Sequence, residues 1–484
     1  MTKMQAPPER SGVGTPLVVD LDGTLLRTNL LFECVLAFLR LRPLGLFLML
    51  GWLARGRAHL KQELARRIPL DPKLLPVNEE FYAYLTAERA RGRRTYLATA
   101  ADAEYACAIA AYYGPFDGVL ASDGTVNLKG QRKAERLADA FPEGFSYAGD
   151  SRADEPVWSH AAEVIAVGGT RITGRAAKFG KPVITFLTPA VLPALAECAR
   201  PHQWAKNLLV LAPAVLGGVA DDPSRMLRVL IALAALCIIA SSTYILNDLL
   251  DVADDRRHWS KRQRPIASGR LPVAVAAGAV PLGLAVGFAL GALVGPAVVA
   301  TLLVYTLLTV AYSLSLKRMP IVDVMVLAGL YTLRLVLGTV AAAIAPSLWL
   351  LVFSMFLFGS LCFAKRFIEV ERWKERGEAR VANRGYEAVD SPLLFALGIG
   401  TAIASTVTIV LYIIFDIFPH DLYRHAGWLW AFPVILFLWS CRIWLAAGRH
   451  QLDDDPVAFA LNDRPSLLLG AALLSAFVLA WSAP

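Results

Sequence analysis

Hydrophobic residues are distributed very differently in the two parts of the chain. Up to about Ala199, charged residues and prolines interrupt short apolar runs, whereas from Leu208 onward long apolar segments alternate with short charged loops. At roughly 20 apolar residues per membrane crossing, the second part predicts about nine transmembrane helices. The candidate spans lie near 206–219, 227–247, 272–292, 295–314, 322–344, 347–364, 392–415, 427–446 and 465–482. The first is short and contains Pro213, which disfavours a continuous helix there.

The composition also indicates a chain embedded in membrane lipids. Of 484 residues, 56% are hydrophobic and 18% are charged, which is too apolar for a soluble globular protein. The net charge of +8 does not indicate a nucleic-acid partner, because lysines and arginines gather in the loops after spans two, four and six. By the positive-inside rule, we expect an integral protein of the inner membrane whose basic loops and N-terminal part face the cytoplasm.

The first part of the chain is expected to remain outside the bilayer core. Residues 1–15 are polar, are expected to be flexible, and lack the features of a secretory signal. An apolar stretch at 34–53 is interrupted by Arg40, Arg42 and Pro43, and each central Arg disfavours a crossing by about 2.5–3.5 kcal/mol. We therefore expect an amphipathic helical pair on the membrane surface, followed by a basic tract at headgroup level.

An ordered set of polar residues marks the ends of predicted strands in this part. Residues 17–19 predict a short apolar strand that ends in Asp20 and Asp22. Both carboxylates leave the strand tip in nearly the same direction, so one can attack phosphorus and the other can protonate a leaving group. Two further strands and a helical stretch carry Thr99, Lys133, Asp150 and Asp154. This set, over about residues 20–185, resembles the four motifs of the haloacid dehalogenase (HAD) superfamily.

The HAD resemblance implies a Rossmann-like α/β domain with a helical cap at about 30–90. It implies Asp20 as nucleophile, Asp22 as general acid/base, and Thr99 with Lys133 as phosphate-binding residues, although Lys129 competes with Lys133 for that role. It further implies Mg²⁺ held by the carboxylates of Asp20, Asp22, Asp150 and Asp154. Clustered carboxylates need such a hard cation, which also screens a phosphate from the anionic nucleophile. The alternative is a HAD-like domain kept for assembly, without turnover.

A second acidic motif lies near the cytoplasmic end of span two. Asn247, Asp251 and Asp255 are four residues apart, so on a helix they share one face, with Asp248 beside them. Stacked carboxylates repel one another, and the usual compensation is Mg²⁺ bound jointly with a substrate diphosphate. The alternative is a helix end solvated by the neighbouring arginines, but acidic residues at membrane depth are costly unless they have a function.

This motif, followed by the basic segment 261–269, resembles the UbiA superfamily of intramembrane transferases. The segments 200–207, 312–317, 365–369 and 455–460 are similar to the branch that contains decaprenyl-phosphate phosphoribosyltransferase. Where a second acidic pair would be expected in an ordinary UbiA prenyltransferase, this sequence has Tyr312, Lys317 and one acid, Asp323. One acidic cluster with many cations suits a phosphorylated sugar diphosphate together with a polyprenyl phosphate.

The resemblance implies Mg²⁺-dependent transfer of 5-phosphoribose from phosphoribosyl diphosphate to a polyprenyl (decaprenyl-type) phosphate. Asn247, Asp248, Asp251 and Asp255 would hold the metal. The expected substrate-binding residues are Arg200, Gln203, Lys206, Asn207, Lys261, Arg264, Tyr312, Lys317, Asp323, Lys365 and Arg366. Two alternatives stay open: a prenyltransferase that joins a prenyl diphosphate to an aromatic or small acceptor, and a non-catalytic lipid-binding membrane protein. A homo-oligomer is also left open.

The expected organisation is a HAD-like hydrolase domain at 16–190 and an all-α, UbiA-like transmembrane domain at 198–484. A lipid-linked 5-phosphoribose still carries a phosphate monoester, which is the kind of bond that HAD enzymes hydrolyse, so the two domains are expected to act in sequence. Because every expected transferase ligand follows residue 198, the sequence predicts a transferase that works without its first 190 residues.

Overall fold

The structure, a computed structural model, describes residues 14–42, 45–375, 384–420, 423–452 and 456–482. Most of the predicted flexible terminus at 1–15 lies outside these residues. Two units are formed, the first by Met1–Pro201 with Tyr244–Pro281 and the second by His202–Thr243 with Leu282–Pro484. The end of span two and the loop that follows it therefore belong to the same unit as the N-terminal part.

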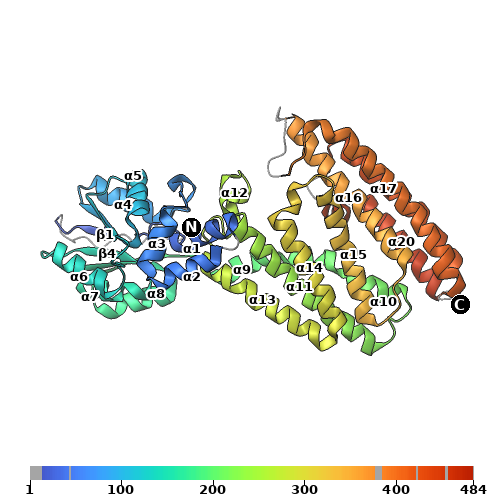
Figure 1. Ribbon diagram of the computed structural model, residues 1–484, viewed down its shortest axis with the longest axis horizontal. Helices are drawn as coiled ribbons and strands as arrows, with labels where there is room; N and C mark the ends of the chain where they lie inside the picture. The colour runs from blue at the N-terminus through green and yellow to red at the C-terminus, as the bar shows by residue number, and fades with distance from the viewer. Residues whose placement is uncertain (1–13, 43–44, 376–383, 421–422, 453–455, 483–484) are drawn as a thin grey trace. The chain divides into compact units, whose positions relative to one another are not determined.

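A six-stranded parallel sheet is the centre of the first unit, in the order β3-β2-β1-β4-β5-β6 (Figure 1). The strands are β1 (Leu17–Val19), β2 (Thr95–Asp102), β3 (Gly118–Ser122), β4 (Ser146–Gly149), β5 (Glu163–Gly168) and β6 (Val183–Leu187). Val18 of β1 pairs with Tyr96 of β2 and with Tyr147 of β4. The carboxyl ends of β1, β2 and β4 consequently meet at one edge of the sheet. The expected Rossmann-like α/β fold is confirmed.

Both faces of this sheet are covered by helices, as the alternation of side chains along β1 requires. Leu17 and Val19 enter one core with α5, while Val18 enters the opposite core with Trp158 of α7. The helices after the cap are α5 (Ala103–Tyr113), α6 (Gln131–Ala140), α7 (Glu155–His160), α8 (Thr170–Ala176) and α9 (Val191–Ala199). All side chains of β1 are fully buried, so the sheet gives the residues that follow it a rigid base.

The segment 30–90, expected to form a helical cap, is helical between β1 and β2. It contains α1 (Leu30–Leu41), α2 (Gly45–Ala54), α3 (Arg57–Ala65) and α4 (Glu79–Ala90). α1 buries its apolar face, including Cys34 and Phe38. α2 leaves most of its apolar surface exposed, with the Phe47 side chain 71% exposed. With 10 residues it is about 15 Å long, half the thickness of a hydrocarbon core, so it is too short to cross a membrane. Pro43 lies outside the described residues.

Eight helices of the described chain are long and apolar enough to cross a membrane. They are α11 (Pro223–Leu250), α13 (Val273–Val294), α14 (Pro296–Leu314), α15 (Val322–Ala342), α16 (Leu348–Glu375), α17 (Ser391–Tyr412), α18 (Ala431–Gly448) and α20 (Arg464–Ser482). They correspond to eight of the nine predicted spans. A short helix, α12 (Val252–Arg257), follows α11.

The remaining predicted span, at 206–219, is not one long helix. The chain there forms a 3-10 helix, Pro201–Leu211, and then the five-residue α10 (Ala212–Leu216). Pro213 stands in the first turn of α10, where its missing N–H is tolerated, and Gly217 with Gly218 ends the helix. The sequence was apolar enough for a span, but its proline and glycines limit each helical piece to less than a membrane thickness.

Candidate functional sites

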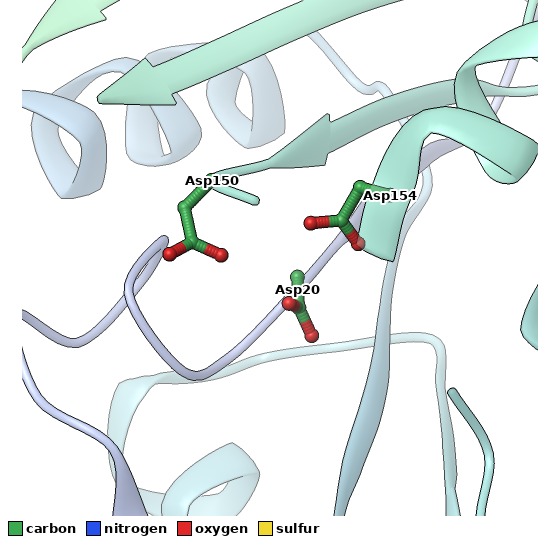
Figure 2. A group of neighbouring side chains, drawn as sticks. All are labelled: Asp20, Asp150 and Asp154. Carbon is green, nitrogen blue, oxygen red and sulfur yellow. The ribbon is translucent and has the colours of Figure 1, made fainter. Parts of the chain in front are cut away.

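Three carboxylates from β1 and β4 meet at the carboxyl edge of the sheet. Asp20 directly follows β1, Asp150 follows β4, and Asp154 stands one turn later (Figure 2). Each offers an oxygen atom within 4.8 Å of the others, and among the described residues this is the one group of acidic, histidine or cysteine side chains gathered tightly enough to hold a metal ion. Gly23 makes the approach possible, because a Cβ there would lie 2.0 Å from an Asp150 oxygen.

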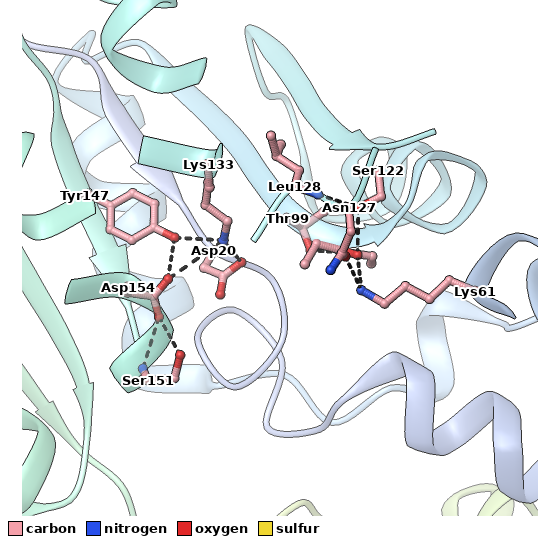
Figure 3. Close-up of polar contacts among 12 residues, drawn as sticks. Asp20, Lys61, Thr99, Ser122, Asn127, Leu128, Lys133, Tyr147, Ser151 and Asp154 are labelled. Carbon is pink, nitrogen blue, oxygen red and sulfur yellow. Dashed lines mark hydrogen bonds and ion pairs between the residues drawn. The ribbon is translucent and has the colours of Figure 1, made fainter. Parts of the chain in front are cut away.

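Lys133 of α6 is the cation in contact with this acidic group. Its ammonium donates to Asp20 Oδ1 at 2.9 Å and to the Tyr147 hydroxyl at 2.9 Å, and it lies 3.8 Å from Asp154 (Figure 3). Burial raises the pKa of Asp20 to about 7, against the opposing effect of Lys133. Burial and the neighbouring carboxylates also raise the pKa of Asp150 well above its usual value. Because one lysine faces a group of three carboxylates, of which Asp20 and Asp154 are buried, the donor set fits a hard divalent cation such as Mg²⁺.

The other expected residues of this site lie around the same edge. Asp22 accepts a hydrogen bond from the backbone N–H of Leu30 at 3.0 Å, at the start of α1. Thr99 is fully buried in β2, and its hydroxyl accepts from the Ala101 N–H. Lys133 is buried and touches Asp20, whereas Lys129 is exposed, so the geometry favours Lys133 for the phosphate-binding role.

Lys61 is a candidate residue that the sequence reasoning did not single out for this site. It comes from α3 in the cap, and its ammonium donates to the Ala100 carbonyl and, at 2.9 Å, to the Asn127 side chain (Figure 3). It lines one cavity together with Asp22, and burial lowers its pKa. In the sequence Lys61 is one cation in a basic tract, so only the packing of α3 against the end of β2 distinguishes it.

The second acidic motif lies where α11 and α12 meet. α11 ends at Leu250 and α12 begins at Val252, so the predicted continuous helix is interrupted at Asp251. The backbone N–H groups of Asp251 and Asp255 still donate to carbonyls four residues earlier, at 2.9 and 2.8 Å. The four-residue spacing expected for Asn247, Asp251 and Asp255 is therefore retained.

Arginines neutralise the two buried carboxylates of this motif. Asp248 is 2% exposed and accepts from Arg200 and, at 3.0 Å, from Arg264. Asp255 is 4% exposed and accepts from the same Arg264 nitrogen at 2.9 Å. Burial raises the pKa of Asp255 to about 6, and Arg264 opposes this shift. The structure thus brings two of the four expected metal ligands together around a guanidinium group, in a site that already balances negative with positive charge.

The second unit has its own buried charge cluster, around Asp323. This residue is completely buried at the start of α15, and its two oxygens accept from Arg366 of α16 and, at 2.6 Å, from the Tyr386 hydroxyl. The Tyr312 hydroxyl accepts from Arg366 at 3.1 Å and from Arg384 at 2.7 Å. Three of the expected substrate-binding residues, Tyr312, Asp323 and Arg366, are therefore neighbours.

The other expected substrate-binding residues differ in how far they are buried. Asn207 is buried, Lys261 is exposed, and the rest are partly buried: Gln203, Lys206, Lys317 and Lys365.

Arg334, in the middle of α15, is a candidate residue that the sequence reasoning missed. It donates a hydrogen bond to the Asn207 side chain. Arg334 is 5% exposed, lies against the rings of Tyr305 and Tyr331, and also donates to the Tyr305 hydroxyl. Placing an arginine inside a membrane-spanning helix costs free energy. A buried arginine at such a position is therefore a candidate for a functional role.

Comparison with known families gives one match for each part of the chain. The model of the UbiA prenyltransferase family matches residues 208–464, and that of haloacid dehalogenase-like hydrolases matches residues 17–159. The chain belongs to the UbiA prenyltransferase family and carries a HAD-like domain at its N-terminus. It is accordingly an integral membrane protein, and both families indicate an enzyme.

Individual relatives extend this assignment. An uncharacterized protein of Sinorhizobium fredii is 39% identical over 96% of this chain and 91% of its own. Decaprenyl-phosphate phosphoribosyltransferase of Corynebacterium glutamicum is 34% identical over 59% of this chain and 85% of its own. Among solved structures, a UbiA homolog from Archaeoglobus fulgidus bound to GPP and Mg²⁺ is 14% identical, with coverage of 59% and 99% and a TM-score of 0.45.

Replacing Lys133 tests the charge balance of the HAD-like site. We expect Lys133→Met to lower the stability of the first unit by about 3–5 kcal/mol without Mg²⁺, because the buried carboxylates of Asp20 and Asp154 lose their cation. Added Mg²⁺ should restore more stability to the variant than it adds to the wild type. Thermal unfolding of the full chain, with EDTA or Mg²⁺, measures both effects. The exposed Lys129→Met is the matched control, and an equal response to Mg²⁺ in all three proteins would contradict a metal at this site.

Proposed function

We propose that this protein transfers 5-phosphoribose from phosphoribosyl diphosphate to a polyprenyl phosphate, and that its HAD-like domain then removes the 5-phosphate. The family and the relatives named decaprenyl-phosphate phosphoribosyltransferase support the first step. The active-site loops and the HAD-like domain would face the cytoplasm at the inner membrane, where phosphoribosyl diphosphate is a soluble substrate.

The observation that carries the proposal is the state of Asp323. A prenyltransferase that holds a prenyl diphosphate between two acidic motifs needs carboxylate oxygens available in both. Here Arg366 and Tyr386 engage both oxygens of Asp323, and all three residues are buried, so this region is a cluster of guanidinium and phenol groups in place of a second acidic pair. Such a cluster suits phosphate groups, because guanidinium donors bind phosphate oxygens in pairs. This favours two phosphorylated substrates over an aromatic acceptor.

The acidic motif of α11 and α12 is proposed to bind the diphosphate of the sugar donor. Asn247, Asp248, Asp251 and Asp255 would hold Mg²⁺, which stabilises the charge that develops on a departing diphosphate. Arg264 now bridges Asp248 and Asp255. On binding, the Arg264 guanidinium could turn to the diphosphate, and Asp248 and Asp255 would then be free to hold Mg²⁺, whose role is to offset the negative charge of the diphosphate.

The chain needs no general base for this transfer. The lipid phosphate is already an anionic oxygen nucleophile, and the residues of the chain have only to position it beside C1 of the ribose. Arg200, Gln203, Lys206, Asn207 and Lys365 are proposed for the lipid phosphate. The remaining phosphates are assigned to Lys261, Arg264, Tyr312, Lys317 and Arg366.

The HAD-like domain is proposed to act on the product of the first step. Asp20 would attack the 5-phosphate and form an aspartyl-phosphate, with Asp22 protonating the departing ribose oxygen, and water would then release inorganic phosphate. Lys133, Thr99 and Lys61 are proposed to bind the phosphoryl oxygens. The exposed apolar surface of α2 gives the domain a means of resting on the bilayer beside a lipid-linked substrate.

Removal of one carboxylate tests the transferase site. Asp255→Ala should lower phosphoribosyl transfer on the order of 10²-fold, because the leaving diphosphate loses part of its charge compensation. The assay follows labelled phosphoribosyl diphosphate into decaprenyl phosphate with purified full-length protein and Mg²⁺. Asp221→Ala, in a loop of the second unit, controls for unspecific effects. Label transfer that is undiminished in a folded Asp255→Ala protein, or a wild type that accepts only prenyl diphosphates, would refute the proposal.

The order of the two steps is tested at Asp20. Asp20→Asn keeps the side chain's shape and weakens the nucleophile, so the phosphorylated lipid should accumulate while its rate of formation stays within about twofold of the wild type. Thin-layer chromatography of the labelled lipids, before and after phosphatase treatment, distinguishes the two products. Equal phosphate release from the isolated lipid by the wild type and Asp20→Asn would assign the domain another substrate or a structural role.

The role of α2 is tested by making its exposed surface polar. The double variant Phe47→Ser with Leu50→Ser should lower dephosphorylation of the lipid product about tenfold or more, because two apolar side chains no longer enter the bilayer. Hydrolysis of a small water-soluble phosphate ester should be unchanged. Val126→Ser, at a residue 45% exposed in a loop of the same unit, is the control. Equal loss on both substrates would indicate damage to the site instead of lost membrane contact.

A further inference from the structure

A buried ion pair joins the HAD-like domain to the loop that follows the acidic motif. Glu33 lies in the first turn of α1, and both its oxygens accept from Arg256 of α12, at 2.6 and 3.1 Å. The two side chains are 4% and 7% exposed. Thr28 also donates to Glu33, and Arg256 donates through Nε to the Ala267 carbonyl at 3.0 Å. Every polar group of the pair is thus engaged, as a buried bidentate pair requires.

Two further contacts fix the same loop against the same helix. Arg40, near the end of α1, pairs with Asp254 at 2.6 Å, where both side chains are about 30% exposed. Gly269, in a left-handed conformation at φ +72°, lies so close to Arg27 that a Cβ would meet its carbonyl oxygen at 2.6 Å. The loop is therefore held from 254 to 269 by residues that precede and form α1.

This arrangement connects the two candidate sites within one unit. Asp22 accepts from the N–H of Leu30 at the beginning of α1, and Glu33 is one turn further on. Arg256, which Glu33 holds, is adjacent in sequence to Asp255, and Asp255 shares Arg264 with Asp248. α1 thus starts at a carboxylate of one site and contacts the residue beside a carboxylate of the other.

We propose that Glu33 is a positioning residue for the transferase: by holding Arg256, it fixes α12 and keeps Asp255 available to hold the Mg²⁺ that accompanies the substrate diphosphate. Glu33 and the carboxylates of the acidic motif compete for the same guanidinium group. Arg256 lies within a few residues of Asp251 and Asp255, and without Glu33 its guanidinium would be a buried, uncompensated cation. It would then turn to the nearest carboxylates and occupy the oxygens that the metal and diphosphate need.

This inference rests on the proposed transferase function and gives the HAD-like domain a part in it. It also reverses one expectation from the sequence. Deletion of the first 190 residues removes Glu33, Arg40 and Arg27, so the transferase is expected to lose its support for α12 although every expected ligand remains.

The test uses the full chain in lipid nanodiscs and compares three variants. Glu33→Gln keeps the shape and removes the charge; Glu33→Arg with Arg256→Glu exchanges the charges; Arg40→Gln breaks the neighbouring, more exposed pair. In Glu33→Gln we expect hydrogen exchange of amides in 252–271 to quicken about tenfold or more, because the loop opens without its buried anchor. The exchanged pair should recover much of the protection, and Arg40→Gln should change it little, because exposed ion pairs contribute little.

Transfer kinetics separate positioning from general damage. Glu33→Gln should raise the KM for phosphoribosyl diphosphate about tenfold with a smaller change in kcat, whereas a loss of folded protein would lower kcat alone. Unchanged exchange of 252–271 in Glu33→Gln, or changed exchange with unchanged KM, would overturn the proposal, as would an exchanged pair no better than Glu33→Gln. If the wild type transfers no phosphoribose, the proposed function fails, and the exchange data still decide whether Glu33 anchors the loop.

Discussion

Repulsion between buried carboxylates is the constraint on which both candidate sites depend. The HAD-like site sets one lysine against three carboxylates, and this excess of carboxylate oxygens fits a divalent cation. The acidic motif after α11 sets Arg200 and Arg264 against Asp248 and Asp255, and its charge is balanced already. The first arrangement suits a metal ion held by the protein alone. The second suits the proposed exchange of partners, in which an anionic substrate would bind the arginine and release the carboxylates for a metal ion.

This difference explains why a phosphorylated donor suits the membrane site. Guanidinium groups stay charged at any physiological pH, so they cannot leave a carboxylate by deprotonation and must be offered another anion. A diphosphate supplies that anion and brings the metal with it. In the second unit Arg366 holds Asp323 in the same way, and a phosphate would again have to compete for the arginine. The proposed site would then favour substrates that carry several phosphate oxygens.

The sequence predicted the elements whose signals are local. The strand ends at Asp20 and Asp150, the α/β fold and eight long apolar helices follow from short patterns, and the structure has all of them. The segment at 206–219 deviated because Pro213 and two glycines outweigh its apolar content. Arg334, Lys61 and the pair Glu33–Arg256 were missed for another reason. Each of these residues is recognised only by its contact with a residue distant in sequence, which for Glu33 is 223 positions away. No spacing rule applied to a single sequence predicts such a contact.

The same long-range contact bears on why the two domains share one chain. Two separate enzymes could exchange a lipid intermediate by diffusion in the membrane. Fusing them into one chain would by itself raise only their local concentration. The ion pair between Glu33 and Arg256 links the two parts more firmly than fusion alone. Its side chains are 4% and 7% exposed, so separating them would leave a buried charge without its partner. The first N–H of α1, that of Leu30, also donates to Asp22, so this helix contacts a carboxylate of the HAD-like site as well as Arg256, the neighbour of Asp255. The HAD-like domain and residues 244–281, which carry the acidic motif, are thus parts of one folded unit. The domain proposed to remove the phosphate ester therefore supports the segment proposed to help produce it.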